Sequence, residues 1–280
     1  MELFDRIDPT RQWLEMKRQT GKTIGFVPTM GALHEGHIAL VRRARKENDI
    51  IGCSIFVNPI QFNNPEDLEK YPRTLEEDLQ MLREVGCDLV FVPSATEMYP
   101  GPVTEKYDFG SLERVMEGAF RPGHFNGVAV VVKKLFSIFN PDRAYFGEKD
   151  FQQLRIIQAL VKMENLPVAI IPCPTVREMD GLAMSSRNRR LTAEERSVAP
   201  EIYRTMLEVS LRYGSLNVAD ARKMALERLT RCGFIPEYVE ISAVSDLQPV
   251  LDWDDKIPTR IFVACLLGKV RLIDNLEIIS

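Results

Sequence analysis

The sequence predicts an α/β protein with a Rossmann-like, doubly wound parallel sheet in its N-terminal domain and a smaller α+β C-terminal domain. Short apolar runs rich in β-branched residues alternate with helical patterns up to about residue 176. This alternation favours a parallel sheet covered by helices on both faces. After that point, two helical stretches are followed by strand-like runs. We therefore expect two closely joined domains, residues 1–176 and 177–280.

The expected strands of the first domain are short and apolar, and they cover residues 23–28, 50–59, 88–93, 142–147 and 167–172. Helical patterns lie between them, at residues 37–48, 75–85, 124–140 and 151–164. Thr74 and Glu77 have the spacing of a capping box for the second helix. The third helix contains a valine run that is also compatible with a strand. In the second domain we expect helices at 193–212 and 217–232, then strands at 237–244, 260–267 and 270–274.

The bulk composition argues against several classes of protein. The chain has 280 residues and a net charge of −4, which gives no electrostatic support for nucleic-acid binding. Its five cysteines are far apart, as expected for reduced thiols in a cytoplasmic protein. No apolar run approaches the roughly 20 residues that span a bilayer, and the N-terminus does not resemble a signal peptide. We expect a cytoplasmic protein that binds neither nucleic acid nor membrane.

The segment "PTMGALHEGH" follows the first long strand. Gly31 and Gly36 allow the backbone to approach a ligand closely. His37 falls near a helix start, where free N–H groups favour an anion, and both His34 and His37 can donate hydrogen bonds to charge on a leaving pyrophosphate. The pattern predicts a phosphate site. Two alternatives are incidental loop histidines and a metal site, for which HxxH supplies only two ligands and His124 brings no cluster of further ligands.

Polar side chains also follow later strands. Asn58 and Gln61 in "FVNPIQF" carry amides that suit a ligand with hydroxyl and carboxylate groups, although an ordinary polar loop gives the same pattern. Arg121 and His124 in "RPGHF" stand before a helix, where they could hold an anion, belong to a lid or form a cap. The sequence alone leaves these interpretations open.

Two more segments suggest phosphate contacts. In "FGEKDFQQ", Lys149 is a point charge suited to phosphate, Asp150 is equally typical of a helix cap, and Gln153 lies one turn further on. In "GLAMSSRN", two serines and an arginine in a glycine-led turn can hold triphosphate oxygens. This segment lies at the expected domain join, so it could close over a nucleotide, or it could be a polar linker.

Together these segments resemble a known family. "HEGH" resembles the HxGH signature of the nucleotidyltransferase superfamily that includes class I aminoacyl-tRNA synthetases, and "MSSRN" resembles its KMSKS-type loop, with serine and arginine in place of the lysines. The set "PTMGALHEGH", "FVNPIQF", "YPRT", "RPGHF", "FGEKDFQQ" and "PTVREMDGLAMSSRNRRL" closely resembles the pantoate–β-alanine ligase (pantothenate synthetase) family. It covers about residues 26–191 in order, and the C-terminal third matches in length and pattern with fewer signatures.

The resemblance implies two half-reactions in one site. The pantoate carboxylate attacks the α-phosphate of ATP and gives pantoyl adenylate and pyrophosphate, and β-alanine then attacks the mixed anhydride and gives pantothenate and AMP. The resemblance further implies Mg²⁺ bound mainly through the phosphates, without a dedicated protein metal site. It also implies a homodimer and a C-terminal domain that acts as a lid over the active site.

The resemblance also implies roles for individual residues. The catalytic residues would be His34, His37, Lys149 and Arg187, where His37 either transfers a proton or only stabilises charge. Pantoate and β-alanine would be bound by Gln61, Gln153 and Asn58. The ATP site would be lined by Pro28, Met30, Gly31, Ala32, Leu33, His34, Glu35, Gly36, His37, Gly147, Glu148, Lys149, Asp150, Val176, Met184, Ser185, Ser186 and Arg187.

Two rival functions use the same residues. A nucleotidyltransferase would transfer AMP to a phosphate-bearing acceptor, and a non-catalytic sensor would only bind ATP. Isotope exchange between pyrophosphate and ATP separates them, because it requires pantoate for the ligase, a phosphate-bearing acceptor for the transferase, and is absent in a sensor.

Overall fold

The computed structural model describes residues 1–278, which form two compact units. The first unit contains residues 1–109, 121–148 and 153–174. The second contains residues 110–120, 149–152 and the chain from residue 175 onward. Each unit is thus assembled from segments that are separated in the sequence.

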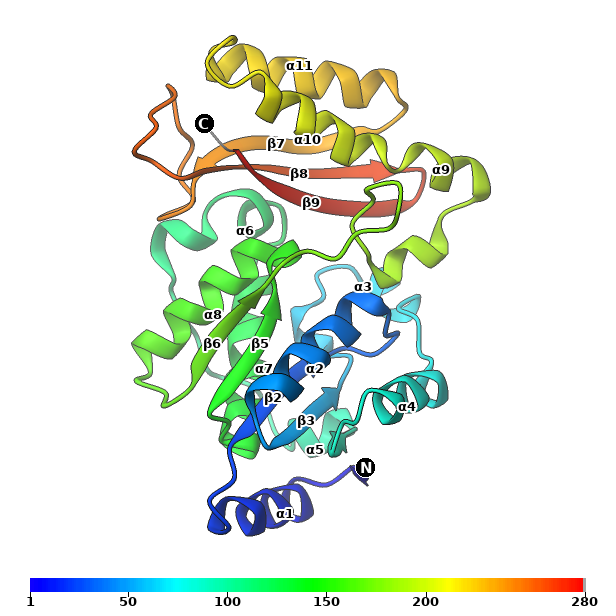
Figure 1. Cartoon of the computed structure of the whole chain (residues 1–280), viewed down its shortest axis with the longest axis vertical. Helices are drawn as coiled ribbons and strands as arrows, with labels where there is room; N and C mark the ends of the chain where they lie inside the picture. Colours follow the sequence, from blue (N-terminus) through cyan, green and yellow to red (C-terminus); the bar gives the residue numbers. More distant parts are fainter. Residues whose placement is uncertain (279–280) are drawn as a thin grey trace. The chain divides into compact units, whose positions relative to one another are not determined.

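The first unit is built on a parallel sheet of six strands, as the alternating pattern predicts (Figure 1). Its strand order is β1-β4-β3-β2-β5-β6, which places β2 in the interior. The bounds are Glu2–Phe4 for β1, Ile24–Thr29 for β2, Ile50–Ile55 for β3, Leu89–Phe91 for β4, Arg143–Gly147 for β5 and Ala169–Cys173 for β6. The short edge strand β1 was not among the expected elements. Ligands of such sheets bind beyond the carboxyl ends of the strands.

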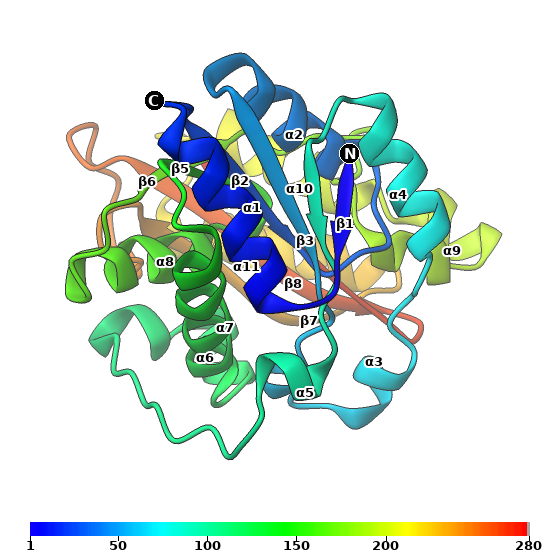
Figure 2. The same cartoon turned by 90° about the horizontal axis from the view of Figure 1, so that it is seen from below.

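Helices cover both faces of this sheet. They are α1 (Ile7–Gln19), α2 (Glu35–Glu47), α3 (Pro65–Glu69), α4 (Leu75–Glu84), α5 (Ala95–Met98), α7 (His124–Phe139) and α8 (Phe151–Met163), whose first two residues group with the second unit. Side chains of α2 and α4 share one apolar core with strand residues such as Val27, Cys53 and Val90. On the other face, Phe139 of α7 stacks on Phe26 of β2 with ring centroids 4.0 Å apart. Figure 2 shows α1 beside α7 on this face.

The valine run of "HFNGVAVVVKKLFSIFN" forms helix, as predicted, because α7 is 16 residues long and almost entirely buried. The predicted capping box at the start of α4 is wrong. Thr74 precedes α4, but its side chain forms no cap hydrogen bond, so the capping box with Glu77 is not formed. The Thr74 hydroxyl instead donates to the Asp78 carboxylate at 3.1 Å, a contact that matters for the site below.

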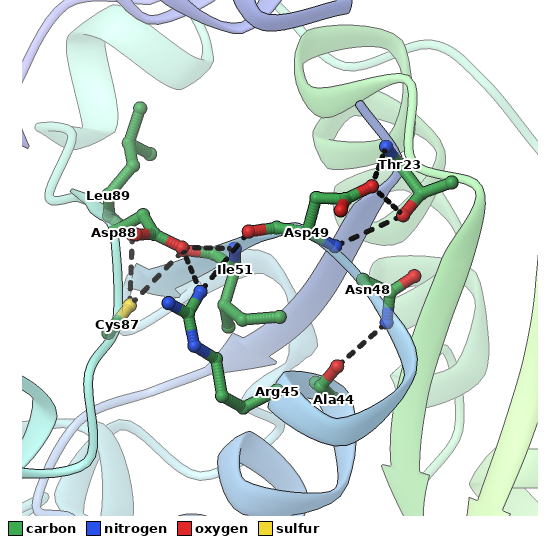
Figure 3. Close-up of polar contacts among 9 residues, drawn as sticks. All are labelled: Thr23, Ala44, Arg45, Asn48, Asp49, Ile51, Cys87, Asp88 and Leu89. Carbon is green, nitrogen blue, oxygen red and sulfur yellow. Dashed lines mark hydrogen bonds and ion pairs between the residues drawn. The ribbon is translucent and has the colours of Figure 1, made fainter. Parts of the chain in front are cut away.

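Polar contacts fix the amino ends of the central strands, opposite the edge where ligands bind (Figure 3). Asp49 accepts hydrogen bonds from the backbone N–H and the hydroxyl of Thr23 at 2.9 and 2.8 Å. Asp88 accepts from the backbone N–H of Ile51 at 2.8 Å and pairs with Arg45 at 2.7 Å. These carboxylates satisfy backbone donors that the parallel ladder leaves unpaired at its end.

The second unit contains the antiparallel sheet β7-β8-β9, formed by β7 (Ile235–Ala243), β8 (Thr259–Leu267) and β9 (Val270–Ile278). Helices α10 (Glu201–Leu211) and α11 (Val218–Arg231) lie along one face of this sheet and share its apolar core (Figure 1). The single helix expected at 193–212 is wrong: α9 (Ala193–Val198) and α10 are separate helices. Pro200 at the break lacks an N–H and cannot continue the ladder of α9.

A buried ion-pair network ties the segment 110–120 to this sheet. Glu117, in α6 (Met116–Phe120), accepts from both terminal nitrogens of Arg271 at 2.9 and 2.7 Å. The Tyr238 hydroxyl also donates to Glu117, at 2.7 Å. Gln152 accepts from the Glu117 backbone N–H at 2.9 Å. A buried charge requires such partners, so segment 110–120 is an integral part of the second unit.

No helix within residues 1–278 is both long enough and apolar enough to cross a membrane.

Candidate active site

The turn after β2 has an unusual backbone. Gly31 and Ala32 both adopt positive φ, at 78° and 50°. Glycine tolerates this region freely, whereas alanine is strained there. The Gly31 N–H donates to the Thr29 hydroxyl at 3.2 Å, and that hydroxyl donates to the Ser54 carbonyl on the adjacent strand at 2.7 Å. The turn is therefore anchored to the carboxyl ends of β2 and β3.

The two histidines of "HEGH" cap the helix that follows this turn. His34 is the N-cap of α2, and its Nδ1 accepts from the Gly36 backbone N–H at 3.1 Å. His37 makes the reciprocal contact: its Nδ1 accepts from the His34 backbone N–H at 3.3 Å. The ring centroids lie 4.1 Å apart. An imidazole whose Nδ1 accepts carries its proton on Nε2 when neutral, so Nε2 of each neutral ring is a donor.

Asp78 on α4 holds the same turn from the other side. Its Oδ2 accepts from the Ala32 N–H at 2.9 Å, and its Oδ1 accepts from the Leu33 N–H at 2.7 Å. The residue is 1% exposed. Sequence patterns did not identify Asp78, because "TLEEDL" is typical of the acidic first turn of a surface helix. The local signals that this carboxylate faces inward are the leucines Leu79 and Leu82, of which Leu82 lies one turn further along the same face of the helix, and both are buried.

A second polar group lies after β3, around the short 3-10 helix Pro59–Gln61. Asn58 donates to Gln61 Oε1 at 3.0 Å and to the Gly127 carbonyl at 3.1 Å, and it accepts from the Tyr99 hydroxyl at 2.8 Å. Gln61 Nε2 donates to Met30 Sδ at 3.3 Å. Burial raises the pKa of Tyr99, so its hydroxyl remains a donor. Three residues expected in the site, Met30, Asn58 and Gln61, are thus in contact.

His124 fixes the backbone of this loop. Its Nδ1 donates to the Gln61 carbonyl at 2.8 Å, because Arg121 donates to its Nε2 at 3.1 Å and so defines the tautomer. Gly127, one turn further along α7, approaches the loop closely: a Cβ there would lie 2.5 Å from the Ile60 carbonyl oxygen. The "RPGHF" segment therefore supports the loop that carries Gln61.

The segment after β5 begins with the 3-10 helix Glu148–Asp150, whose last two residues belong to the second unit. Lys149 has a side chain 18% exposed, and its Nζ lies 3.8 Å from Asp150 Oδ2. The Lys149 carbonyl accepts from Asn275 of β9 at 2.8 Å. The position of the lysine is thus set by the C-terminal sheet, a partner that no sequence motif indicates.

The "MSSRN" turn is also organised by its own unit. Arg177 and Ala183 form an antiparallel bridge, and the Met184 N–H donates to the Val176 carbonyl at 3.0 Å. Ser185 then caps the 3-10 helix Ser186–Arg190 by accepting from the Arg187 N–H at 3.3 Å. Arg177 secures this hairpin through two contacts with buried Asp274, at 2.5 and 3.0 Å.

The expected site residues therefore fall into two groups. The first unit contains Pro28, Met30 to His37, Asn58, Gln61, Gly147, Glu148 and Gln153, and the second contains Lys149, Asp150, Val176 and Met184 to Arg187. Gln153 is partly buried on α8. Within residues 1–278, no group of three or more histidine, cysteine or acidic side chains is arranged to hold a metal ion.

A parallel α/β sheet whose central strand ends in a histidine-capped HxGH turn defines a nucleotide-binding protein of the HxGH class. The comparisons with known proteins are more specific. The family model described as pantoate-beta-alanine ligase matches residues 2–277, and the chain belongs to this family.

Relatives and solved structures named pantothenate synthetase or pantoate-beta-alanine ligase match this chain over almost their full length. The pantothenate synthetase of Cytophaga hutchinsonii is 46% identical over 276 residues, which cover 98% of each chain. That of Aquifex aeolicus is 48% identical over 285 residues, covering 99% of each. The crystal structure of pantothenate synthetase from Thermus thermophilus superposes with a TM-score of 0.93 at 44% identity, covering 100% of both chains. The Francisella tularensis pantoate-beta-alanine ligase, complexed with beta-gamma ATP and beta-alanine, gives 0.82 at 38% identity, covering 99% of this chain and 97% of that one.

Proposed function

We propose that this enzyme condenses pantoate with β-alanine in an ATP-dependent reaction, through a pantoyl-adenylate intermediate, and releases pyrophosphate and AMP. The observation that carries the proposal is the HxGH turn, in which two histidines use Nδ1 to cap the helix start, so that each neutral ring has its proton on Nε2, a donor suited to phosphate. The name of the Francisella tularensis complex supports ATP and β-alanine as ligands of this family.

In the first half-reaction a pantoate carboxylate oxygen attacks the α-phosphorus, and the bond from that phosphorus to pyrophosphate breaks. His34 and His37 stabilise the charge that develops, and Lys149 and Arg187 add positive charge at the phosphates. Loss of one such donor typically costs about 3–4 kcal/mol of transition-state stabilisation. No proton transfer to pyrophosphate is needed for this step, so hydrogen bonding by His37 is sufficient.

In the second half-reaction the β-alanine nitrogen attacks the acyl carbon, the bond from that carbon to AMP breaks, and the amine proton is released. Gln61 and Gln153 hold pantoate through their amides, while Asn58 orients Gln61. The three described hydrogen bonds of Asn58 are all internal. We therefore propose that Asn58 positions the Gln61 side chain and does not contact pantoate itself.

The nucleotide would be bound by the turn from Met30 to His37, by Gly147 to Asp150, by the Val176 backbone and by Met184 to Arg187. Mg²⁺ would be held mainly by phosphate oxygens and water, which suits a cation that prefers octahedral oxygen ligands, and it would neutralise phosphate charge. We also propose a cytoplasmic homodimer with a C-terminal lid. Sedimentation equilibrium tests the dimer, since a monomer mass would contradict it.

The decisive experiment is isotope exchange between pyrophosphate and ATP. Exchange that depends on pantoate and proceeds without β-alanine is the expected result. Exchange that depends instead on a phosphate-bearing acceptor, or no exchange with any acceptor, would contradict the proposed reaction.

A further inference from the structure

We infer that Asp78 is a positioning residue for adenylate formation: it clamps the strained turn that delivers His34 and His37 to the phosphates. The inference deepens the proposed function and rests on it. Asp78 is not assigned to any reacting atom. It acts through the backbone of the turn, and it lies outside every sequence motif described above.

Backbone donors of the turn occupy both oxygens of the Asp78 carboxylate. Both of its oxygens accept backbone hydrogen bonds from consecutive residues, Ala32 and Leu33, at 2.9 and 2.7 Å. Thr74 adds a third hydrogen bond at 3.1 Å. Carboxylate hydrogen bonds of this kind are stronger than neutral ones, and burial strengthens them further. A single side chain on α4 therefore fixes two peptide groups at the carboxyl end of β2.

The backbone that Asp78 holds is strained. Ala32 has a positive φ of 50°, a conformation that a residue with a Cβ adopts only when its surroundings impose it. Asp78 supplies part of that constraint. A Cβ added to Gly31 would lie 3.0 Å from Asp78 Oδ2, so the carboxylate is packed tightly against the turn as well as bonded to it.

The backbone that Asp78 holds lies next to the two histidines in the sequence. Leu33 immediately precedes His34, whose imidazole caps α2 and is paired with His37. A shift at Ala32 and Leu33 is therefore passed to both rings through the cap. Misplacement by about 1 Å can reduce a rate about 100-fold. Asp78 thus determines the position and orientation of the two imidazole rings.

The primary test is Asp78→Asn. The amide keeps the size of the side chain but turns one acceptor into a donor, which opposes a backbone N–H. We expect kcat/KM of pantoate-dependent pyrophosphate–ATP exchange to fall about 100-fold. Turnover of pre-formed pantoyl adenylate with β-alanine releases no pyrophosphate, so we expect it to change less than about 10-fold. Equal losses in both half-reactions, or no loss in either, would overturn the inference.

A matched control lies at the opposite end of the neighbouring strand β3. Asp49 also accepts from a backbone N–H, that of Thr23 (Figure 3). Asp49→Asn makes the same change in charge and chemistry away from the turn, and we expect both half-reactions to stay near wild type. Thr74→Val and Thr74→Ser form a second pair. Loss of the hydroxyl in Thr74→Val should reduce exchange by about 3–10-fold, and Thr74→Ser should restore it.

Amide hydrogen exchange tests the hydrogen bonds from Ala32 and Leu33 to Asp78 independently of enzyme activity. In Asp78→Asn, the Ala32 and Leu33 amides should exchange faster than in wild type, whereas unchanged protection would overturn the inference. If the wild-type enzyme shows no pantoate-dependent exchange of pyrophosphate, the proposed function fails, and this measurement still decides whether Asp78 holds the turn.

Discussion

At the scale of single residues, the two HxGH histidines combine a structural and a chemical role. In each ring Nδ1 satisfies a helix-start N–H, so the other nitrogen carries the proton of the neutral ring and is a donor. Ordinary N-caps are serine, threonine, asparagine or aspartate; an aspartate there has no donor at all and a hydroxyl donates close to the backbone, whereas the imidazole accepts through Nδ1 and donates through the nitrogen on the other side of the ring. Histidine at both places fixes the helix start and, in the proposed reaction, also positions the donors to the phosphates.

We expect His34→Ala and His37→Ala to reduce adenylate formation much more than folding stability. Each removes one donor to the phosphates, which corresponds to a loss of about 100–1,000-fold, whereas losing the cap contact costs about 1 kcal/mol. Pyrophosphate exchange measures the first loss, and chemical denaturation measures the second. Near-normal turnover of pre-formed pantoyl adenylate by the variants is expected. An equal loss in both half-reactions would contradict the assignment.

At the scale of elements, the loop carrying Gln61 depends on how closely α7 approaches it. His124 donates to the Gln61 carbonyl, and Asn58 donates to the Gly127 carbonyl. Because Gly127 has no side chain, the helix and the loop meet at backbone distance. Two elements far apart in sequence thus hold the loop that carries Gln61, the residue that we propose binds pantoate.

Gly127→Ala tests this approach. The added Cβ would lie 2.5 Å from the Ile60 carbonyl oxygen and 2.8 Å from the Gln61 Cα, so the loop must shift. Because Gln61 is assigned to pantoate, we expect KM for pantoate to rise about 10-fold or more while KM for ATP changes little. Steady-state kinetics with each substrate varied in turn provides the measurement. Gly101→Ala is the matched control, since a Cβ at Gly101 meets nothing within 4 Å. Parallel changes in both KM values would count against the assignment.

Helices α10 and α11 offer a prediction on pH. Arg228 on α11 donates to Glu201 on α10 at 2.9 Å and holds the pKa of that carboxyl below its usual value. A lowered folded pKa adds stability above the unfolded pKa, and this stability is lost as the pH falls through the folded pKa. We expect Arg228→Met to lower the free energy of unfolding by about 1 kcal/mol at about pH 7.

The difference between wild type and Arg228→Met should shrink as the pH falls below about 4.3, where Glu201 is protonated in the unfolded chain. Urea unfolding at a series of pH values from about 7 down to about 3 measures it. Arg204→Met is a useful comparison, because Arg204 contacts the same carboxylate but is more exposed and should contribute less. A difference that persists unchanged at the acid end of the series would exclude the ion pair as its origin.

At the scale of the whole molecule, buried thiols limit stability in alkali. Burial raises the pKa of Cys87 to about 12 and that of Cys173 to about 11. Unfolded thiols titrate near about 8.5, so the unfolded state releases their protons first and stability falls as the pH rises above about 8.5. Each such thiol should cost about 1.4 kcal/mol at about pH 9.5.

Urea unfolding between about pH 7.5 and about pH 9.5 checks this prediction, in a range below the titration of the tyrosines. Cys173→Ala should show a shallower alkaline decline than wild type. Cys232→Ala is the control, because Cys232 is the one cysteine of the five that is only partly buried. The prediction fails if the two variants and the wild type lose stability in parallel.

The architecture was predictable because hydrophobic periodicity and β-α alternation are local properties. The strands β2 to β9 and the helices α2, α4, α7, α8 and α11 lie where these patterns place them, and the valine-rich α7 followed from its length and apolarity. Strand β1 and helix α1 were not expected, and the stretch 193–212 forms two helices instead of one. The long-range contacts that hold the site residues in position were not predictable. Asp78 and Ala32 are 46 residues apart, and Asn275 and Lys149 are 126 apart. The motifs identified candidate ligand contacts, but Asp78 and Asn275, which hold two of those motifs in place, carry no signature.

The composition of the second unit has a consequence for modularity. Because segments 110–120 and 149–152 belong to the second unit, the chain from residue 175 onward is not a complete domain that could be transferred to another protein. A fragment excised there would lack Glu117, and Arg271 and Tyr238 would lose the carboxylate that binds both. Recombination at this boundary would separate most of the second unit from its own segments 110–120 and 149–152, so the gene is expected to be inherited and engineered as one piece.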